Sequence, residues 1–338
     1  MKTCPNCFSD KELHAFLSSS KEIGKCDVCS SIDVPILDVT ELLDFFHELL
    51  SNFSPNPDGE SLKSKIQANW SFFANHVTAK KILNHVLPLL STSIANADSP
   101  VEFSSEIIQN VGYWDTLTEE LKWSRRFLSD VSYLTDELGW DGFFNVQFEL
   151  QSSARLYRAR LHHQSGQPVY GPDKLKCPDP KISSGGRANP IGIPVLYLSD
   201  SIETTIYEVR ASYLDEVSVG EFKVADGRNS IKVVDFTEEP SLYRPGRVVE
   251  NITAHLLKQR ISRELSKPMR RYDSEIEYIP TQFICEFIRI ITGADGIRFA
   301  SSVHAEGKNI VVFDQKLMEC ISSETHRVDR LKISHNRI

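Results

Sequence analysis

The stretch SGGRANPIGIPVLYLSDSIETTIYEVR, residues 184–210, combines a glycine-rich loop, an apolar run and a segment with helix-forming pattern. Two glycines directly before Arg187 give the backbone conformational freedom, and Pro190 and Pro194 favour extended backbone in the residues before them. The apolar run 195–199 is rich in strand-forming residues. This stretch therefore predicts a loop followed by a strand.

The polar residues after this strand predict the start of a helix. Asp200 or Ser201 is expected to cap a helix that begins near Ile202, and Glu203 is placed to complete a capping box. The same helix carries Glu208. A loop arginine, a strand tyrosine and a helix glutamate then come from three consecutive elements, an order that can line a cleft.

The composition is that of a globular protein. The chain has 338 residues, of which 41% are hydrophobic and 25% charged, enough for two or three domains. The net charge of -8 disfavours a protein that coats nucleic acid or an anionic membrane. No apolar run approaches the roughly 20 residues of a membrane-spanning helix, and the N-terminus lacks a signal-peptide core. We expect a cytoplasmic protein without a membrane partner.

Two cysteine pairs near the N-terminus predict a metal site. The pairs read CPNC and CDVC, and the four cysteines are Cys4, Cys7, Cys26 and Cys29. In a reducing compartment such spacing favours metal over disulfide, and four thiolates satisfy tetrahedral zinc with no open position. A structural Zn²⁺ in a zinc ribbon over residues 1–36 is therefore expected. A redox pair and chance spacing are the alternatives.

Residues 37–148 are predicted to form a helical domain, because apolar residues recur there at spacings of three and four. Helices are expected within residues 38–50, 61–77, 78–90 and 119–134, and loops at 51–60 and 91–100. A helical ribonuclease is not indicated, since no arginine and histidine share a helix face at the right spacing. The nearby aromatic residues are expected in the core and not as a base-stacking platform: Trp70, Phe72 and Phe73. The domain is a candidate regulator, dimerisation surface or target reader.

The rest of the chain predicts the α+β class, with a mixed sheet. Strands are expected at 154–160, 195–199, 219–225, 230–236, 295–302 and 309–314, and helices at 201–214, 247–265 and 280–292. The motifs GxGxxG, GxxxxGK[ST], HExxH and GxSxG are all missing from the sequence. Rossmann dinucleotide binding, P-loop hydrolysis, zincin proteolysis and a hydrolase nucleophile elbow therefore lack their usual support.

Four separated blocks resemble the RES domain in order and spacing. They are LYRAR (156–160), GGRANPIGIPVLYLSDSIETTIYEVR (185–210), YIPTQFICEFIRIITGADGIRFASS (278–302) and GKNIVVF (307–313). RES domains resemble a compact ADP-ribosyltransferase fold and are known as toxins that degrade NAD⁺ by hydrolysis or phosphorolysis. The resemblance implies a catalytic domain over residues 149–322, followed by a polar tail, 323–338. The zinc ribbon and helices resemble an N-terminal, HEPN-like extension that accompanies some RES domains.

The resemblance also implies the site residues, which are Arg158, Arg187, Tyr197, Glu208 and Ser301. The last block reads FASS where the family more usually has tyrosine, proline and serine, so Ser302 stays an alternative to Ser301. Tyr278 and Gln282 also match the family, and we expect them to be structural. Without the family pattern, each of these residues would fit an ordinary surface or core position.

These residue types suit cleavage of NAD⁺, the implied substrate. The guanidinium groups of Arg158 and Arg187 are expected to bind the pyrophosphate. The carboxylate of Glu208 would stabilise positive charge that develops on the ribose as nicotinamide leaves. Hydrogen bonds to the ribose hydroxyls, or orientation of the incoming water or phosphate, are alternative roles for it. Tyr197 is expected to pack against nicotinamide or ribose, and Ser301 to add a polar contact. Arg158, Glu208 and Ser301 are the predicted catalytic residues.

The leading hypothesis is a toxin or antiphage defence effector that acts as an NAD⁺ glycohydrolase or phosphorylase. The alternatives are an ADP-ribosyltransferase that modifies a protein or nucleic acid, and a non-catalytic, zinc-dependent binding module. Candidate partners are an antitoxin or trigger protein that restrains the activity and a second copy of the chain, whereas the charge disfavours nucleic acid.

Overall fold

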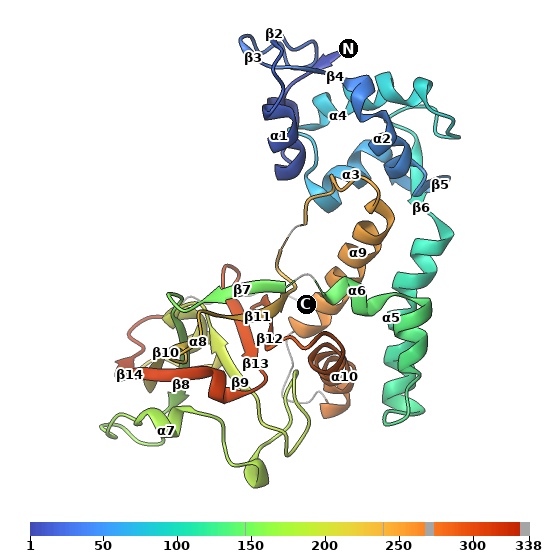
Figure 1. The fold of residues 1–338 in the computed structure, drawn as a ribbon. Helices are drawn as coiled ribbons and strands as arrows, with labels where there is room; N and C mark the ends of the chain where they lie inside the picture. Colours follow the sequence, from blue (N-terminus) through green and yellow to red (C-terminus); the bar gives the residue numbers. More distant parts are fainter. Residues whose placement is uncertain (146, 239, 268–273, 332–338) are drawn as a thin grey trace. The chain divides into compact units, whose positions relative to one another are not determined.

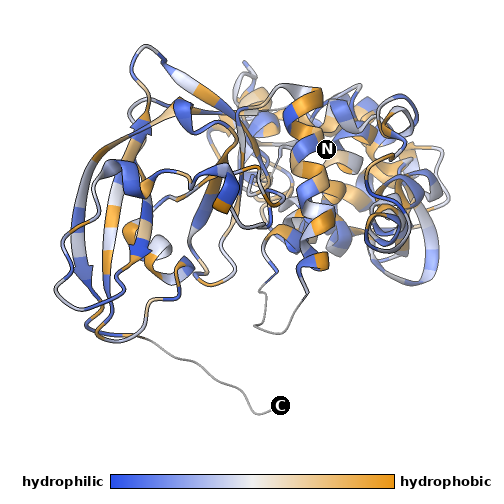
Figure 2. Ribbon diagram, turned by 90° about the horizontal axis from the view of Figure 1, so that it is seen from below, coloured by the Kyte–Doolittle hydropathy of each residue, from blue (hydrophilic) through white to orange (hydrophobic). Residues whose placement is uncertain are grey.

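The computed structural model describes residues 1–145, 147–238, 240–267 and 274–331, and its fold is of the α+β class. The chain divides into two compact units (Figure 1). The first contains Met1–Tyr113 and Glu239–Leu257, and the second contains Trp114–Glu238 and Lys258–Ile338. In both units hydrophobic and hydrophilic residues intermix along the helices and strands, as expected for amphipathic elements (Figure 2).

The first unit consists mainly of helices, with short two-stranded sheets. Its strands are β1 (Lys2–Thr3), β2 (Ile23–Gly24), β3 (Val34–Pro35), β4 (Leu37–Asp38), β5 (Phe53–Ser61) and β6 (Pro100–Phe103). Its helices are α1 (Lys11–Ser18), α2 (Leu43–Leu50), α3 (Leu62–Trp70) and α4 (His76–Val86). The aromatic residues Trp70, Phe72 and Phe73 are buried in its core, as predicted.

Two predictions for this unit are wrong. The expected loop 51–60 contains β5, which pairs antiparallel with β6, because its backbone finds a partner strand despite a sequence rich in turn-forming residues. The expected helix 61–77 ends at Trp70. Ser71 has a positive φ of 46°, and the side chain of Gln67 bonds both the carbonyl and the amide of Phe73, so the chain turns away.

A segment from the C-terminal half of the sequence belongs to the first unit. Buried Asp10 caps α1 by accepting a bond from Leu13 N, and its other oxygen accepts one from Leu242 N at 2.6 Å. Glu48 accepts bonds from Gly246 N and Val248 N, both at 2.7 Å, and so caps the start of α9 (Val248–Leu265). The helices α5 (Ser105–Trp123) and α9 each contribute residues to both units.

The second unit is built on an eight-stranded mixed sheet with the order β14-β10-β8-β9-β13-β12-β11-β7. The strands are β7 (Gln147–Gln151), β8 (Leu156–Leu161), β9 (Leu196–Ser199), β10 (Glu216–Val224), β11 (Ser230–Asp235), β12 (Gly296–Ala300), β13 (Lys308–Val312) and β14 (Met318–Arg327). The pair β11 and β12 is parallel and the other neighbours are antiparallel. The helices are α6 (Trp140–Phe144), α7 (Pro172–Leu175), α8 (Ile202–Glu208) and α10 (Ile279–Phe287).

The two faces of this sheet bury different cores. One face carries a cluster that includes Leu156, Leu198 and Ile310. The other face carries a cluster around Ala159 and Val219, against which the apolar residues of α8 pack. All six strands and all three helices predicted for the C-terminal part of the chain are present, although α8 is shorter than the expected 201–214.

The predicted polar tail, 323–338, is wrong in its first part. Strand β14 continues to Arg327, which pairs with Glu216 of β10, and Val328 is buried. The polar residues of β14 reflect an exposed strand face and not a solvated tail. Residues 332–338 lie outside the described part of the chain.

Candidate active site and metal centre

Helix α8 presents Glu208 as its last residue. Of the two predicted cap candidates, Asp200 and Ser201, the cap is Ser201, whose Oγ accepts a bond from Thr204 N at 3.1 Å. The helix cannot continue past Val209, because Arg210 has a positive φ of 53°. The short helix therefore ends where its glutamate faces the central strands of the sheet.

The Glu208 carboxylate receives two short hydrogen bonds on one oxygen. Ser301 Oγ and Asn309 Nδ2 each donate to Oε1 at 2.6 Å. Asn309 lies on β13, and its Oδ1 accepts a bond from Ser199 Oγ on the neighbouring strand β9 at 2.9 Å. Ser301 directly follows β12. One residue of β13 and the residue that follows β12 therefore bond this carboxylate, and Ser199 of β9 supports Asn309 from behind.

Ser301 is fixed by the loop that it begins. Its hydroxyl accepts bonds from Val303 N at 3.3 Å and His304 N at 3.2 Å, and its own N–H donates to Gly307 O. The ring of His304 stacks on Tyr207 of α8, with 5.3 Å between the ring centroids. This loop is thereby attached to the helix that carries Glu208.

The hydroxyl of Tyr197 forms hydrogen bonds with the loop that precedes β9. Its hydroxyl donates to Asn189 Oδ1 at 2.9 Å and accepts from Ala188 N at 3.0 Å. Burial raises the pKa of Tyr197, so the phenol remains a donor at neutral pH. Gln282 of α10 donates to the carbonyl oxygens of Gly186 and Asn189, contacts that fit the structural role expected for it.

Arg187, on the same loop, binds backbone carbonyls. Its Nη1 donates to Leu265 O at 3.0 Å, and its Nη2 donates to Lys267 O at 2.6 Å. Nη2 also lies 3.4 Å from Ser302 Oγ. Arg187 therefore bonds the end of α9, where carbonyls lack helical partners.

Arg158 has a buried and unpartnered guanidinium nitrogen. Along β8 its side chain alternates to the sheet face that Leu156 shares. Its Nη1 is buried and has no hydrogen-bond partner among the residues that the structure describes. Burial lowers the pKa of Arg158, and the charge interaction with Cys177 only partly counteracts this effect. A buried donor without a partner is costly, so this nitrogen is suited to an external anion.

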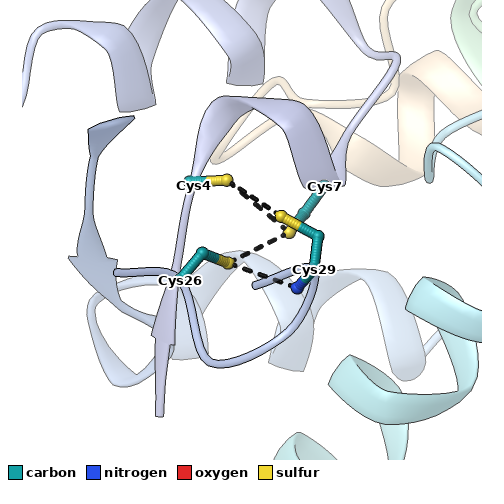
Figure 3. Close-up of side chains that lie close together, drawn as sticks. All are labelled: Cys4, Cys7, Cys26 and Cys29. Atoms are coloured by element: carbon teal, nitrogen blue, oxygen red, sulfur yellow. Dashed lines mark hydrogen bonds between the residues drawn. The ribbon is translucent and has the colours of Figure 1, made fainter. Parts of the chain in front are cut away.

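The four N-terminal cysteines converge on one point (Figure 3). Their sulfur atoms all lie within 4.8 Å of one another, with Sγ–Sγ distances of 3.9 Å for Cys4–Cys7, 3.4 Å for Cys4–Cys29 and 3.5 Å for Cys7–Cys26. Zinc–sulfur bonds of about 2.3 Å give tetrahedral sulfur separations of about 3.8 Å. The cluster could hold a metal ion.

The surroundings of these thiols also fit a cation. Cys4, Cys7 and Cys26 are fully buried, and Cys29 is exposed. Burial raises the pKa of Cys4, and it raises that of Cys7 to about 12. Without a cation the thiols of Cys4 and Cys7 would stay neutral, whereas a bound metal would favour their thiolate forms.

A family model for the RES domain matches residues 155–332. The chain belongs to the RES domain family. The match covers β8 to β14 and contains all five predicted site residues. It also includes the segment up to Leu257 that packs in the first unit. The RES sequence of this chain is therefore not confined to one compact unit.

Other comparisons add little to the family match. None of the curated proteins matches the chain. One chain in a crystal structure of the M. tuberculosis MbcT–MbcA toxin–antitoxin complex is similar, with 14% identity and a TM-score of 0.31. The alignment covers 56% of this chain and 92% of that one. A likeness at this level supports no conclusion about the RES domain here.

Some of the predicted site residues of the RES domain contact one another in the structure, and others do not. Glu208 and Ser301 are in direct contact, and Arg187 reaches Ser302. Within the described residues, no hydrogen bond joins Arg158 to any of them. Sequence reasoning missed Asn309, although it lies in the quoted block GKNIVVF as the one amide in an apolar run.

Proposed function

We propose that the RES domain cleaves the bond between nicotinamide and ribose in NAD⁺, by hydrolysis or phosphorolysis. The observation that carries this proposal is the Glu208 carboxylate, held on Oε1 by Ser301 and Asn309 in a chain of this family. A carboxylate in a fixed position is what an oxocarbenium-like transition state requires.

Glu208 would act by charge stabilisation. Nicotinamide leaves as a neutral molecule, so no acid needs to protonate it, and positive charge grows on the ribose. A fixed carboxylate stabilises that charge more than it stabilises the ground state, which lowers the barrier. The same oxygen could orient the water or phosphate that attacks the anomeric carbon.

The arginines would bind the pyrophosphate. Neither Arg158 nor Arg187 forms an ion pair with a carboxylate in the described part of the chain, so both charges are free to meet an anion. Arg158 is the better placed of the two, because its buried Nη1 has no partner. Arg187 already donates one hydrogen of each terminal nitrogen to a carbonyl, and its contribution would come from its charge and its remaining N–H groups.

The cysteine cluster is proposed to hold a structural Zn²⁺. Four sulfur ligands leave no position for substrate, so the metal would stabilise the N-terminal fold and take no part in the reaction. Loss of NAD⁺ harms a cell, which supports a role as a toxin or defence effector restrained by an antitoxin or trigger protein. Among the described residues, no helix is both long and apolar enough to cross a membrane.

The test is to incubate the purified full chain with NAD⁺, with and without phosphate, and to resolve the products by chromatography. Glu208→Gln is the decisive variant, because glutamine retains an oxygen for Ser301 and Asn309 but loses the charge. Glu203→Gln is the matched control, since Glu203 is an exposed residue of the same helix.

The proposal predicts release of nicotinamide by the wild type and Glu203→Gln, and a loss of at least about 100-fold in Glu208→Gln. The second product identifies the acceptor as water or phosphate, and ADP-ribose attached to a macromolecule would identify a transferase. Equal turnover by wild type and Glu208→Gln, or intact NAD⁺ with folded protein, would overturn it.

A further inference from the structure

The two oxygens of the Glu208 carboxylate have different environments. Oε1 accepts two bonds of 2.6 Å, from Ser301 Oγ and Asn309 Nδ2. Oε2 accepts none from the residues that the structure describes. One oxygen is therefore anchored to the protein, and the other is available to a ligand.

The donors on Oε1 are themselves held in place. Asn309 is 6% exposed, and its Oδ1 accepts a bond from Ser199 Oγ. An ionised carboxylate only accepts hydrogen bonds, so Glu208 itself fixes the Nδ2 end of the amide toward Oε1. The strands β9 and β13 pair with Asn309 opposite Ser199, so the backbone register sets this contact. The amide therefore presents an N–H donor that cannot rotate away without losing its bond to Ser199.

Ser301 has no hydrogen-bonding capacity left for a substrate. A hydroxyl has one donor and two acceptor positions. The donor is used by Glu208, and the acceptor positions are used by Val303 N and His304 N. The serine thus acts on Glu208 and not on NAD⁺, which revises the polar substrate contact expected from the sequence.

We propose that Asn309 is a positioning residue that, with Ser301, anchors Glu208 by Oε1 and directs Oε2 to the ribose. This inference rests on the proposed function. Its consequence is that Asn309 contributes to turnover through the carboxylate alone. A change at Asn309 should lower kcat and leave the KM for NAD⁺ nearly unchanged.

Asn309→Asp tests the contact directly, because it replaces the N–H donor with an oxygen of the same shape. Two ionised carboxylates about 2.6 Å apart repel each other strongly, so the pair would hold one proton up to a folded-state pKa raised above the ordinary value near 4, and would lose it only at higher pH. Other charged or titratable groups near the site are His304, Asp200, Lys308 and Arg187. They are common to every variant, so comparison between variants removes their contribution.

The first measurement is kcat and KM for NAD⁺ between pH 5 and 9. We expect Asn309→Asp to lose about 100-fold in kcat at pH 8 and to recover part of it as the pH falls. Asn309→Ala should lose kcat without this recovery, and Ser199→Ala, one bond further away, should lose less kcat.

Two results would contradict the proposal. A raised KM with normal kcat would show that Asn309 contacts NAD⁺ itself, and a loss of kcat in Asn309→Asp that does not depend on pH would show a merely structural role. Either result overturns the proposal.

A second measurement is independent of activity. The free energy of unfolding of Asn309→Asp, relative to wild type, should be lower at pH 8 than at pH 5, because a raised folded-state pKa adds stability only when the proton is bound. The double variant with Glu208→Gln should abolish this difference. If NAD⁺ is not cleaved but this pattern is present, the proposed function fails and the Glu208–Asn309 contact stands. If the pattern is missing, the contact itself is refuted.

Discussion

The hydroxyl of Tyr197 donates a hydrogen bond to Asn189 Oδ1. The loop that contains Asn189 also approaches the phenol ring closely at Gly186. Tyr197→Phe should free the loop that carries Arg187 while it retains the ring. Loss of the bonds to Asn189 and Ala188 should cost about 1–3 kcal/mol in unfolding free energy. Denaturant unfolding measures this cost.

A second comparison tests whether the ring of Tyr197 contacts NAD⁺. If it does, and the hydroxyl serves only to hold the loop by hydrogen bonds, Tyr197→Leu should impair turnover more than Tyr197→Phe. Equal effects of the two variants on turnover would contradict the ring contact.

Gly186 leaves room for the Tyr197 hydroxyl. A Cβ at this position would lie 2.7 Å from the hydroxyl oxygen and 2.9 Å from Asn189 Oδ1. Gly186→Ala should therefore break the Tyr197–Asn189 bond and reduce both stability and turnover. Gly185→Ala is the control, since its Cβ would meet its nearest atom at 3.4 Å. Similar thermal midpoints for the two variants would argue against the close approach.

Ser301 and Ser302 should differ sharply in their effect on turnover. Ser301 bonds Glu208 at 2.6 Å, whereas the side chain of Ser302 makes a 3.4 Å contact to Arg187 and no other hydrogen bond within the described part of the chain. We expect Ser301→Ala to reduce kcat by about 10-fold or more and Ser302→Ala to have a small effect. Steady-state kinetics with NAD⁺ distinguishes them. A larger loss in Ser302→Ala would assign the family serine to the other position.

Local signals predicted the elements around the site well. The cap at Ser201, the strand before it and the blocks that resemble the RES domain are all encoded in short stretches. The contact between Glu208 and Asn309 was not predictable, because it depends on the pairing of β13 with β9 and on the end point of α8. Strand register is a property of the folded sheet, and an asparagine in a strand gives no sign of its partner.

The errors in the first unit have a similar origin. Residues 51–60 contain the asparagine, prolines and glycine of a loop, yet their backbone pairs with β6. The packing of residues near Leu242 and Val248 against Asp10 and Glu48 joins positions about 200 apart in the sequence. Only tertiary contacts reveal such pairings, so composition and periodicity could not predict that the segment Glu239–Leu257 belongs to the first unit and not to the second.

The buried ion pair of Asp235 and Arg298 should make stability depend on pH. Burial alone would raise the pKa of Asp235, but hydrogen bonds from Arg298 and Thr237 outweigh it and lower the pKa. A lowered folded-state pKa adds stability above the unfolded pKa of about 4, and this stability is lost as the pH falls further. Asp235→Asn should cost about 3 kcal/mol at pH 7 and less below pH 4. A difference from wild type that stays constant from pH 7 to pH 3 would exclude this contribution.

The cysteine cluster predicts one metal ion per chain. Elemental analysis of the purified protein should find about one zinc, and Cys4→Ser should lose it because the three remaining thiols leave a tetrahedral position unfilled. Cys177→Ser is the control, since Cys177 lies outside the cluster. A strong chelator should lower the thermal midpoint of the wild type, because metal bound only to the folded state adds to its stability. Protein that contains no metal, or whose midpoint is the same with and without chelator, would refute a structural zinc.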